Sequence, residues 1–224
     1  MNRKEELETA LNRVKNDLKE AGTKAITLVV VTKTYPAEDL LHLYELGVRD
    51  FGESRVQELV KKREVLPKDA RMHMIGSLQR NKINALLPAV DCLQSIDRVS
   101  LVEALGKRAA EPLDVLLEVN IAEEEQKQGM RPDEIPDVIR AVKAFPLLRV
   151  RGMMMMGSHT DDRDIIRDDF RRGRALFDTW AARDEDGVRM EILSMGMSGD
   201  YRIAAEEGAT MVRVGSAILG ERSK

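Results

Sequence analysis

The chain has 224 residues, of which 43% are hydrophobic and 33% are charged, and its formal net charge at pH 7 is -3. This length and composition are typical of a globular protein with a sizeable core, and the slight excess of acidic residues argues against a general nucleic-acid binder. No apolar run reaches the length of a membrane span, and the charged first residues do not resemble a secretory signal. The single cysteine, Cys92, excludes an internal disulfide framework, so we expect a cytoplasmic protein in a reducing compartment.

The first expected element is an amphipathic helix over residues 2–21, which ends at Gly22. Its apolar side chains recur at spacings of three and four residues and are Leu7, Leu11, Val14 and Leu18. We expect residues 1–22 to form a covering helix that packs on the body of the fold. Because this helix carries enough charge to be solvated on its outer side, we expect a monomer.

Strands and helices then alternate to the end of the chain. The expected strands are residues 27–33, 48–52, 71–75, 91–96, 113–120, 147–156, 190–195 and 210–214. The expected helices are residues 36–46, 54–65, 78–87, 99–110, 132–144, 164–182 and 201–207, with a last helical turn at 216–219. For the helix at 99–110, the expected cap is Asp97 or Ser100.

This alternation implies a parallel sheet, and eight units imply an α/β fold of one closed (β/α)8 TIM barrel with an extra N-terminal helix. An open doubly wound sheet is the alternative, but no G-x-G-x-x-G motif follows the first strand. No low-complexity linker interrupts the pattern, so residues 1–224 are expected to form a single domain.

Lys33 stands at the end of the first expected strand, after the apolar run of residues 28–31. A charge at the mouth of a buried strand is costly, and burial lowers the pKa of a lysine and makes its amine nucleophilic. Lys33 is therefore a candidate Schiff-base lysine. The simpler interpretation is a side chain that reaches solvent from a strand end.

The loops after the seventh and eighth expected strands are rich in glycine and serine. They contain Gly196, Ser198 and Gly199 in one loop, and Gly215 and Ser216 in the other. TIM barrels often bind phosphate with these two loops and the N-terminus of a short helix. We therefore expect a phosphate here, although glycine and serine also suit ordinary turns and caps.

Arg213 lies two residues before Gly215, so strand alternation places both residues on one face. If this face is the barrel interior, the guanidinium points toward the mouth, where it could pair with Glu118 or Asp200 or donate to a ligand nitrogen. A reactive lysine, a phosphate site and a fixed cation together suit pyridoxal 5′-phosphate (PLP). Arginine stays protonated and would face an unprotonated ring nitrogen, which makes such a site a poor stabiliser of carbanions.

Several longer stretches carry a resemblance to a known family. They are VVTK at 30–33, DFGE at 50–53, HMIGSLQRNK at 73–82, ID at 96–97, EVNI at 118–121 with KQG at 127–129, RGMM at 151–154, GMSGD at 196–200 and MVRVGS at 211–216. At these residues the chain resembles the pyridoxal phosphate homeostasis protein family, whose fold is similar to the N-terminal barrel of alanine racemase. The stretches follow one another in the expected order over nearly the whole chain, which makes the resemblance specific.

The resemblance implies that Lys33 forms a Schiff base with PLP and that Arg213 faces the ring nitrogen. It implies that the phosphate is held by Ser198, Gly199, Gly215 and Ser216. It also implies a part in the homeostasis of free PLP and in amino-acid balance, without robust catalytic turnover.

Two residues depart from the family pattern. Ser54 stands where the family usually has asparagine, which puts the polar contact from this loop in doubt, although a serine there can still cap the next helix. Met195 replaces a usual leucine, a swap that conserves volume.

A small PLP-dependent amino-acid racemase is the alternative function. Such an enzyme needs acid–base groups on opposite faces of the substrate, and Lys33 can supply one of them. Neither Tyr35 nor Tyr201 is placed on an opposing domain. A Schiff-base aldolase acting on sugar phosphates is a third hypothesis, against which Arg213 argues. PLP-dependent apoenzymes are the candidate partners, as recipients of PLP.

Two other residues are expected to be structural. His73 is expected to be a hydrogen-bonded histidine, and Cys92 a buried thiol within an apolar strand. No His, Cys and Asp cluster in the sequence has metal-ligand spacing, so no metal site is expected.

Overall fold

A closed barrel of eight parallel strands forms the centre of the computed structural model, which describes residues 2–21, 25–122, 124, 128–183 and 185–221. Each strand pairs with the next along the chain, and β8 closes the barrel by pairing with β1. The strands are β1 (Thr27–Val31), β2 (Asp50–Glu53), β3 (Arg71–Met74), β4 (Cys92–Ile96), β5 (Leu113–Val119), β6 (Leu148–Met155), β7 (Val188–Ser194) and β8 (Met211–Val214). The expected TIM barrel is confirmed, because an open doubly wound sheet would leave two unpaired edges.

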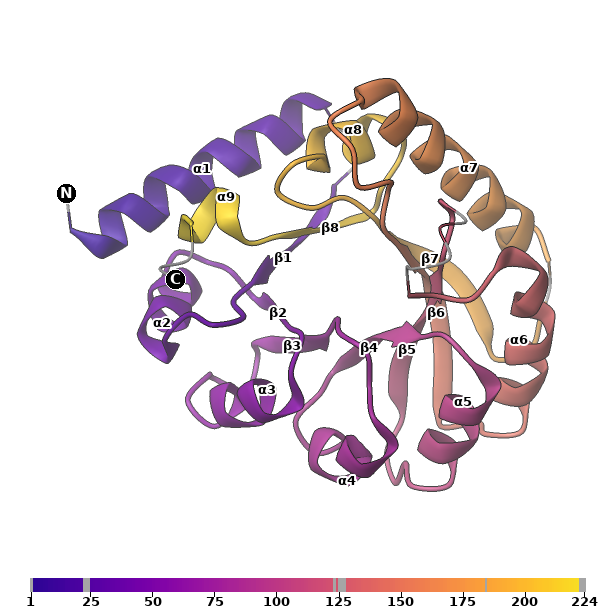
Figure 1. Cartoon of the computed structure of the whole chain (residues 1–224). Helices are drawn as coiled ribbons and strands as arrows, with labels where there is room; N and C mark the ends of the chain where they lie inside the picture. Colours follow the sequence, from indigo (N-terminus) through magenta and orange to yellow (C-terminus); the bar gives the residue numbers. More distant parts are fainter. Residues whose placement is uncertain (1, 22–24, 123, 125–127, 184, 222–224) are drawn as a thin grey trace.

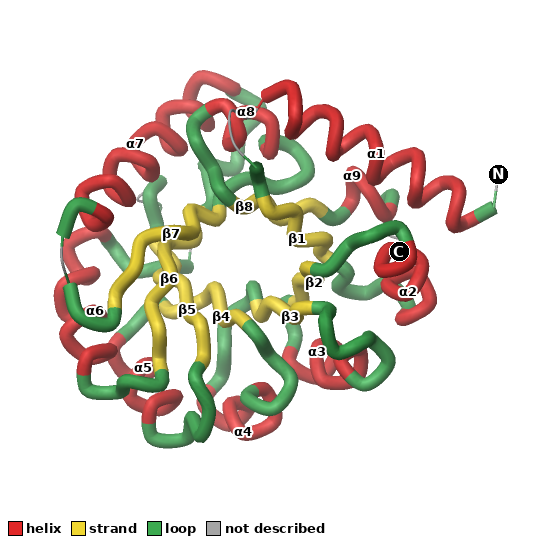
Figure 2. Tube along the Cα trace, turned by 180° about the vertical axis from the view of Figure 1, so that it is seen from behind, coloured by secondary structure: helices red, strands yellow, loops and turns green. Residues whose placement is uncertain are grey.

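Helices surround the barrel on the outside (Figures 1 and 2). The α-helices are α1 (Arg3–Ala21), α2 (Ala37–Glu45), α3 (Val56–Arg63), α4 (Ile83–Leu86), α5 (Val99–Gly106), α6 (Ile135–Lys143), α7 (Arg163–Ala181), α8 (Tyr201–Glu206) and α9 (Ser216–Leu219). Two short 3₁₀ turns, η1 (Arg80–Lys82) and η2 (Pro132–Glu134), lead into α4 and α6. In the described residues, no helix has the combination of length and apolar character that crossing a membrane requires.

The extra N-terminal helix, α1, lies outside the ring and runs alongside α8 and α9 (Figure 1). Its four expected apolar side chains are all buried: Leu7, Leu11, Val14 and Leu18. Polar contacts tie its two ends to the barrel helices. Arg3 pairs with Asp39 of α2 at 2.8 Å, and Asp17 accepts a hydrogen bond from the hydroxyl of Tyr201 in α8.

Alternation along each strand divides the core into two parts. Side chains such as Val30, Phe51 and Leu117 point outward and belong to the main core under the helices. Cys92, Leu116 and Met154 form a smaller apolar cluster on the other face of the sheet, inside the barrel. Cys92 is only 6% exposed, and burial raises the pKa of its thiol, which confirms the buried position expected for it.

Several element boundaries differ from the sequence-based expectations; α5, for example, ends at Gly106 and not at residue 110, and β1 ends at Val31 and not at residue 33. The helix expected at 78–87 is shorter, because Gln79 is extended and the helical turns begin only at Arg80. Strand β7 begins two residues earlier than expected, at Val188. The cap prediction for α5 was wrong, because the N-cap residue is Arg98, whose backbone is extended and whose side chain does not cap the helix. The Arg98 side chain instead donates to Asp97.

Candidate functional site

Lys33 lies in the turn that follows β1, at the edge of the barrel where the strands end, and it is half-buried. The residue before it, Thr32, is fully buried and its N–H donates to the carbonyl of Gly52 in β2. The residue after it, Thr34, has a φ of 73°, which makes it the one non-glycine residue with a left-handed backbone in the described part of the chain. For a β-branched side chain this conformation is strained.

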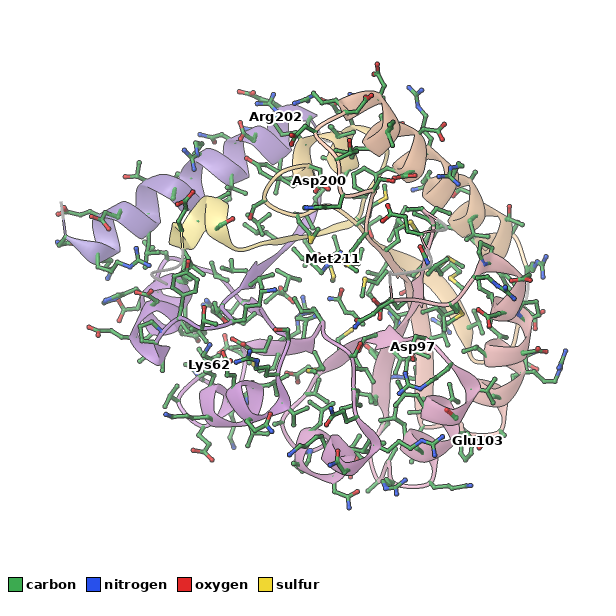
Figure 3. All side chains as sticks on the ribbon, viewed as in Figure 1. Lys62, Asp97, Glu103, Asp200, Arg202 and Met211 are labelled. Atoms are coloured by element: carbon green, nitrogen blue, oxygen red, sulfur yellow. The ribbon has the colours of Figure 1, made fainter. Side chains whose placement is uncertain are left out.

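A buried ion pair lies under this turn. Glu53, at the end of β2, is fully buried, and its Oε1 accepts a hydrogen bond of 2.7 Å from Nζ of Lys62 in α3 and one of 2.5 Å from the Thr32 hydroxyl. Burial raises the pKa of Glu53, while the bonds from Lys62 and Thr32 act in the opposite direction. Figure 3 marks Lys62 on α3, the helix that follows β2.

Arg213 points into the barrel from β8 and is 4% exposed. Its guanidinium donates to the Ser194 hydroxyl at 2.7 Å and to the carbonyl oxygen of Met155 at 3.0 Å. Burial lowers the pKa of Arg213 to about 10, against the opposing charges of Asp200 and Glu118, so the group stays protonated at neutral pH. The pairing with Glu118 or Asp200 that the sequence left open does not occur among the ion pairs of the described residues.

The bond from Arg213 begins a chain of buried polar side chains across the barrel interior. Ser194 of β7 donates to Oε1 of Gln94 in β4 at 2.7 Å, and Nε2 of Gln94 donates to Nδ1 of His73 in β3 at 3.0 Å. Nε2 of His73 then donates to Asp50 of β2 at 2.9 Å. Every bond runs in the same direction, from a cation that only donates to a carboxylate that only accepts. His73 is thus buried and hydrogen-bonded, as the sequence predicted.

The orientation of the Gln94 amide is determined by contacts on both of its ends. Its nitrogen also donates to the sulfur of Met211 at 3.2 Å, so both amide hydrogens and the oxygen have partners. Figure 3 shows Met211 in the barrel interior and Asp200 beside the start of α8.

Asp50 is the carboxylate at the end of this chain of hydrogen bonds. Burial acts to raise the pKa of Asp50, but hydrogen bonds from His73 and Arg71 hold that pKa below its usual value.

The loops after β7 and β8 face one another across Ser198. The hydroxyl oxygen of Ser198 accepts hydrogen bonds from the backbone N–H groups of Gly215 at 3.1 Å and Ala217 at 3.3 Å. The hydroxyl hydrogen is still available to donate. Gly199 is exposed, with no atom within 4 Å of the position that a Cβ would occupy, and Ser216 is also exposed. These loops therefore place the hydroxyls of Ser198 and Ser216 near the open space at Gly199.

Strand pairing brings the predicted site residues to one side of the barrel. Val29 of β1 is paired with Arg213 of β8, and a Cβ on Gly215 would lie 3.1 Å from the carbonyl oxygen of Val31. Lys33 follows two residues after Val31. The lysine, the arginine and the Gly and Ser loops therefore belong to the adjacent strands β7, β8 and β1.

Glu118 points into the barrel from β5 and is 2% exposed. Burial, and next the charge of Asp97, raise the pKa of Glu118 to about 7. Its Oε2 atom has no hydrogen-bond partner among the described residues. Within the same residues, no group of three or more His, Cys, Asp or Glu side chains is arranged to hold a metal ion.

Other polar residues near the site have structural partners. The hydroxyl of Tyr35 donates to the carbonyl of Gly220, and that of Tyr201 donates to Asp17 of α1. Burial and the bond to Asp17 raise the pKa of Tyr201 to about 12. Ser54 does not cap α3, because that helix begins at Val56 with Arg55 as its N-cap residue.

Sequence reasoning missed four residues around the site, namely Glu58, Lys62, Gln94 and Ser194. The sequence did contain a signal for Lys62, because it follows the apolar residues Val56 and Leu59 at a spacing of three residues. In the structure all three side chains are buried on one face of α3. Gln94 and Ser194 each interrupt an apolar strand at an inward position, which also could have been noticed.

Comparison with known proteins places the chain in a family. A family model described as alanine racemase, N-terminal domain, matches residues 6–223. A relative from Aquifex aeolicus named pyridoxal phosphate homeostasis protein is 37% identical over 228 residues, covering 99% of each chain. The chain belongs to the pyridoxal phosphate homeostasis protein family.

Solved structures agree with this family assignment. PipY from Synechococcus elongatus is 27% identical, and the match covers 96% of this chain and 100% of PipY. Its TM-score is 0.87 for the structure without PLP and 0.82 for the structure with PLP bound. Alanine racemase from Corynebacterium glutamicum is 20% identical with a TM-score of 0.73, and the match covers 94% of this chain but 60% of the racemase. That likeness shows a shared fold.

Proposed function

We propose that this chain binds PLP, holds it as a Schiff base on Lys33, and takes part in the homeostasis or delivery of PLP and in amino-acid balance. In this proposal residues 1–224 act as one PLP-binding domain. The observation that carries it is the position of three features on adjacent strands: Lys33 after β1, Arg213 inside β8, and the loops after β7 and β8. The PLP-bound structure of PipY and the name of the Aquifex aeolicus relative support the choice of cofactor.

The side chains and backbone groups at these positions fit PLP. The hydroxyls of Ser198 and Ser216 are donors that suit a phosphate, and Gly199 leaves space beside them. The N–H groups of Gly215 and Ala217 donate to the Ser198 hydroxyl oxygen and so leave its hydrogen for the phosphate. The two bonds to Ser194 and Met155 use two of the five N–H groups of Arg213 among the described residues. The proposed role of Arg213 is to donate to the ring nitrogen, and that of Lys33 is to supply the amine. When bound, PLP supplies an aldehyde that reacts with amines.

A binding function without robust turnover is favoured over a racemase. A racemase would need a second acid–base group opposite Lys33. The hydroxyls of Tyr35 and Tyr201 are instead bonded to Gly220 and Asp17. A cationic Arg213 facing the ring would also keep the cofactor a weak electron sink. We further propose a cytoplasmic monomer that exchanges PLP with PLP-dependent apoenzymes.

The absorption spectrum of the purified protein with PLP, before and after borohydride, tests the cofactor proposal. We expect a near-visible band that borohydride bleaches, and a reduced adduct that mass spectrometry maps to Lys33. Lys33→Ala should lose this band while it retains weak binding of PLP. A spectrum of Lys33→Ala identical to that of the parent would refute the role of Lys33.

Exchange of the α-hydrogen of alanine or serine in deuterated water tests the absence of turnover. We expect no sustained exchange above the rate of free PLP. Steady exchange that disappears in Lys33→Ala would instead establish the racemase alternative.

A further inference from the structure

Two side chains of α3 hold the peptide groups on either side of Lys33. Nζ of Lys62 donates a hydrogen bond of 2.7 Å to the carbonyl oxygen of Thr32, the residue before the lysine. Oε2 of Glu58 accepts a hydrogen bond of 2.8 Å from the backbone N–H of Thr34, the residue after it. Lys33 is therefore bracketed by two charged groups from one helix.

Glu58 and Lys62 act as a pair because of their spacing. Residues four apart lie on the same face of a helix, and the Lys62 ammonium approaches the Glu58 carboxylate to 3.6 Å. Glu53, below the turn, contacts the same ammonium at 2.7 Å. Within the described part of the chain, the polar contacts of the Lys62 ammonium thus go to groups that surround Lys33.

These charges are buried to an unusual degree. The Lys62 side chain is 7% exposed and that of Glu53 is 0% exposed, whereas Glu58 is 24% exposed. Burying an ion pair costs desolvation energy, and packed apolar side chains often serve stability equally well. The ion pair is therefore better explained by the geometry that it imposes on the turn than by the stability of the fold.

The turn itself needs such restraint. The left-handed backbone of Thr34 is a high-energy conformation that persists only when the surrounding structure holds it. The bond from Thr34 N–H to Glu58 holds the peptide group that follows Lys33.

We propose that Glu58 and Lys62 are positioning residues for Lys33, which hold the strained turn and so direct the lysine amine at the aldehyde of PLP. The proposal rests on the proposed function, because it needs Lys33 to be the residue that binds PLP. In the reaction concerned, the neutral amine of Lys33 attacks the aldehyde carbon, a C=N bond forms, and the aldehyde oxygen leaves as water. No oxidant or reductant takes part.

Two ligands separate positioning from simple binding. PLP reports both binding and reaction with Lys33, whereas pyridoxine 5′-phosphate carries a hydroxymethyl group in place of the aldehyde and reports binding alone. The variants are Glu58→Ala, which removes the acceptor for Thr34, and Glu58→Gln, which keeps an oxygen acceptor. Glu64→Ala, at the exposed C-terminal end of the same helix, is the matched control.

The expected result is a change in reaction without a change in binding. In Glu58→Ala the borohydride-reducible Lys33 adduct should form more slowly, by about tenfold or more. This size follows from the strength of the lost hydrogen bond, because a bond to a charged group is worth enough free energy for a tenfold change. Affinity for pyridoxine 5′-phosphate should stay within about twofold of the parent. Glu58→Gln should recover most of the rate, and Glu64→Ala should behave as the parent.

Two outcomes overturn the proposal. One is a Glu58→Ala variant that reacts as fast as the parent, and the other is an equal loss for both ligands, which indicates a merely structural role. Lys62→Met provides a second test. The folded variant should form the Lys33 adduct more slowly than the parent and keep the parent's affinity for pyridoxine 5′-phosphate. If the parent forms no adduct on Lys33 at all, the proposed function fails as well, and that outcome is separate from the other two.

Discussion

The hydroxyl of Ser194 in β7 donates a hydrogen bond of 2.7 Å to the amide oxygen of Gln94 in β4, and so joins two strands that are separated by β5 and β6. The two residues are 100 positions apart in the sequence and both are fully inaccessible to solvent. Ser194 also accepts from Arg213, so a single hydroxyl links the buried cation to the polar chain that ends at Asp50.

Ser194→Ala should destabilise the fold more than the loss of an ordinary serine hydroxyl. The change leaves an N–H of buried Arg213 and the oxygen of Gln94 without partners, which costs about 1–3 kcal/mol for each buried group left unsatisfied. Urea unfolding measures the difference. Ser95→Ala is the control, because the buried Ser95 hydroxyl donates a single bond, to the carbonyl of Gly76. An equal loss in the two variants would contradict the special position of Ser194.

The buried carboxyl of Glu118 should make the fold less stable as the pH rises. Its pKa is raised from 4.5 to about 7 in the folded protein. Between these values the folded state binds more protons than the unfolded state, so the free energy of unfolding falls as the pH rises through this window. At about 1.4 kcal/mol for each tenfold change in proton affinity, the full cost above pH 7 is up to about 3 kcal/mol.

Glu118→Gln removes this titration. The variant should match the parent near pH 4.5 and be more stable than the parent at pH 8, as urea unfolding at several pH values can measure. Glu103→Gln, on the exposed surface of α5 and labelled in Figure 3, is the matched control. A Glu118→Gln variant whose stability falls with pH as steeply as that of the parent would show that another group is responsible.

Gly199→Ala should weaken cofactor binding without a cost in stability. An added methyl group meets no atom within 4 Å, so the free energy of unfolding should stay within about 0.5 kcal/mol of the parent. The same methyl group would occupy space that we assign to the phosphate, so the dissociation constant for PLP should rise. Unchanged PLP affinity would place the phosphate elsewhere. Gly152→Ala gives the contrast, because its Cβ would lie 1.8 Å from the carbonyl oxygen of Ile192 and should destabilise the barrel strongly.

Lys62→Met should cost more stability than the ion pair itself contributes. Removing the ammonium leaves the carboxylate of Glu53 buried without its cation, and breaking a buried pair from one side costs about 3–5 kcal/mol. The double variant Glu53→Gln with Lys62→Met should recover a large part of that loss. Additive losses in this double-mutant cycle would show that the two residues are not coupled.

The order and number of strands were predictable because short strand-like segments alternate with helical patterns along the chain and are bounded by turn residues. Alternation predicted that Arg213 and Gly215 share one face of the strand, but it did not show that this face is the barrel interior. The left-handed backbone of Thr34 was not predictable, since β-branched residues rarely adopt it and nothing local in the sequence requires it. The partners of Gln94 and Ser194 were not predictable either, because they depend on the closure of the barrel and on the relative height of strands far apart in the chain.

The position of α1 has a consequence for how the chain folds. Its apolar face packs on α2, α8 and α9, and its Arg3 side chain donates to the carbonyl of Leu219. Because α8 and α9 come only after β7 in the chain, the apolar side chains Leu7, Leu11, Val14 and Leu18 of α1 are not fully covered until residues 201–219 have been synthesised. Contacts between such distant segments form slowly. Docking of the first helix against α8 and α9 is therefore a late step in folding.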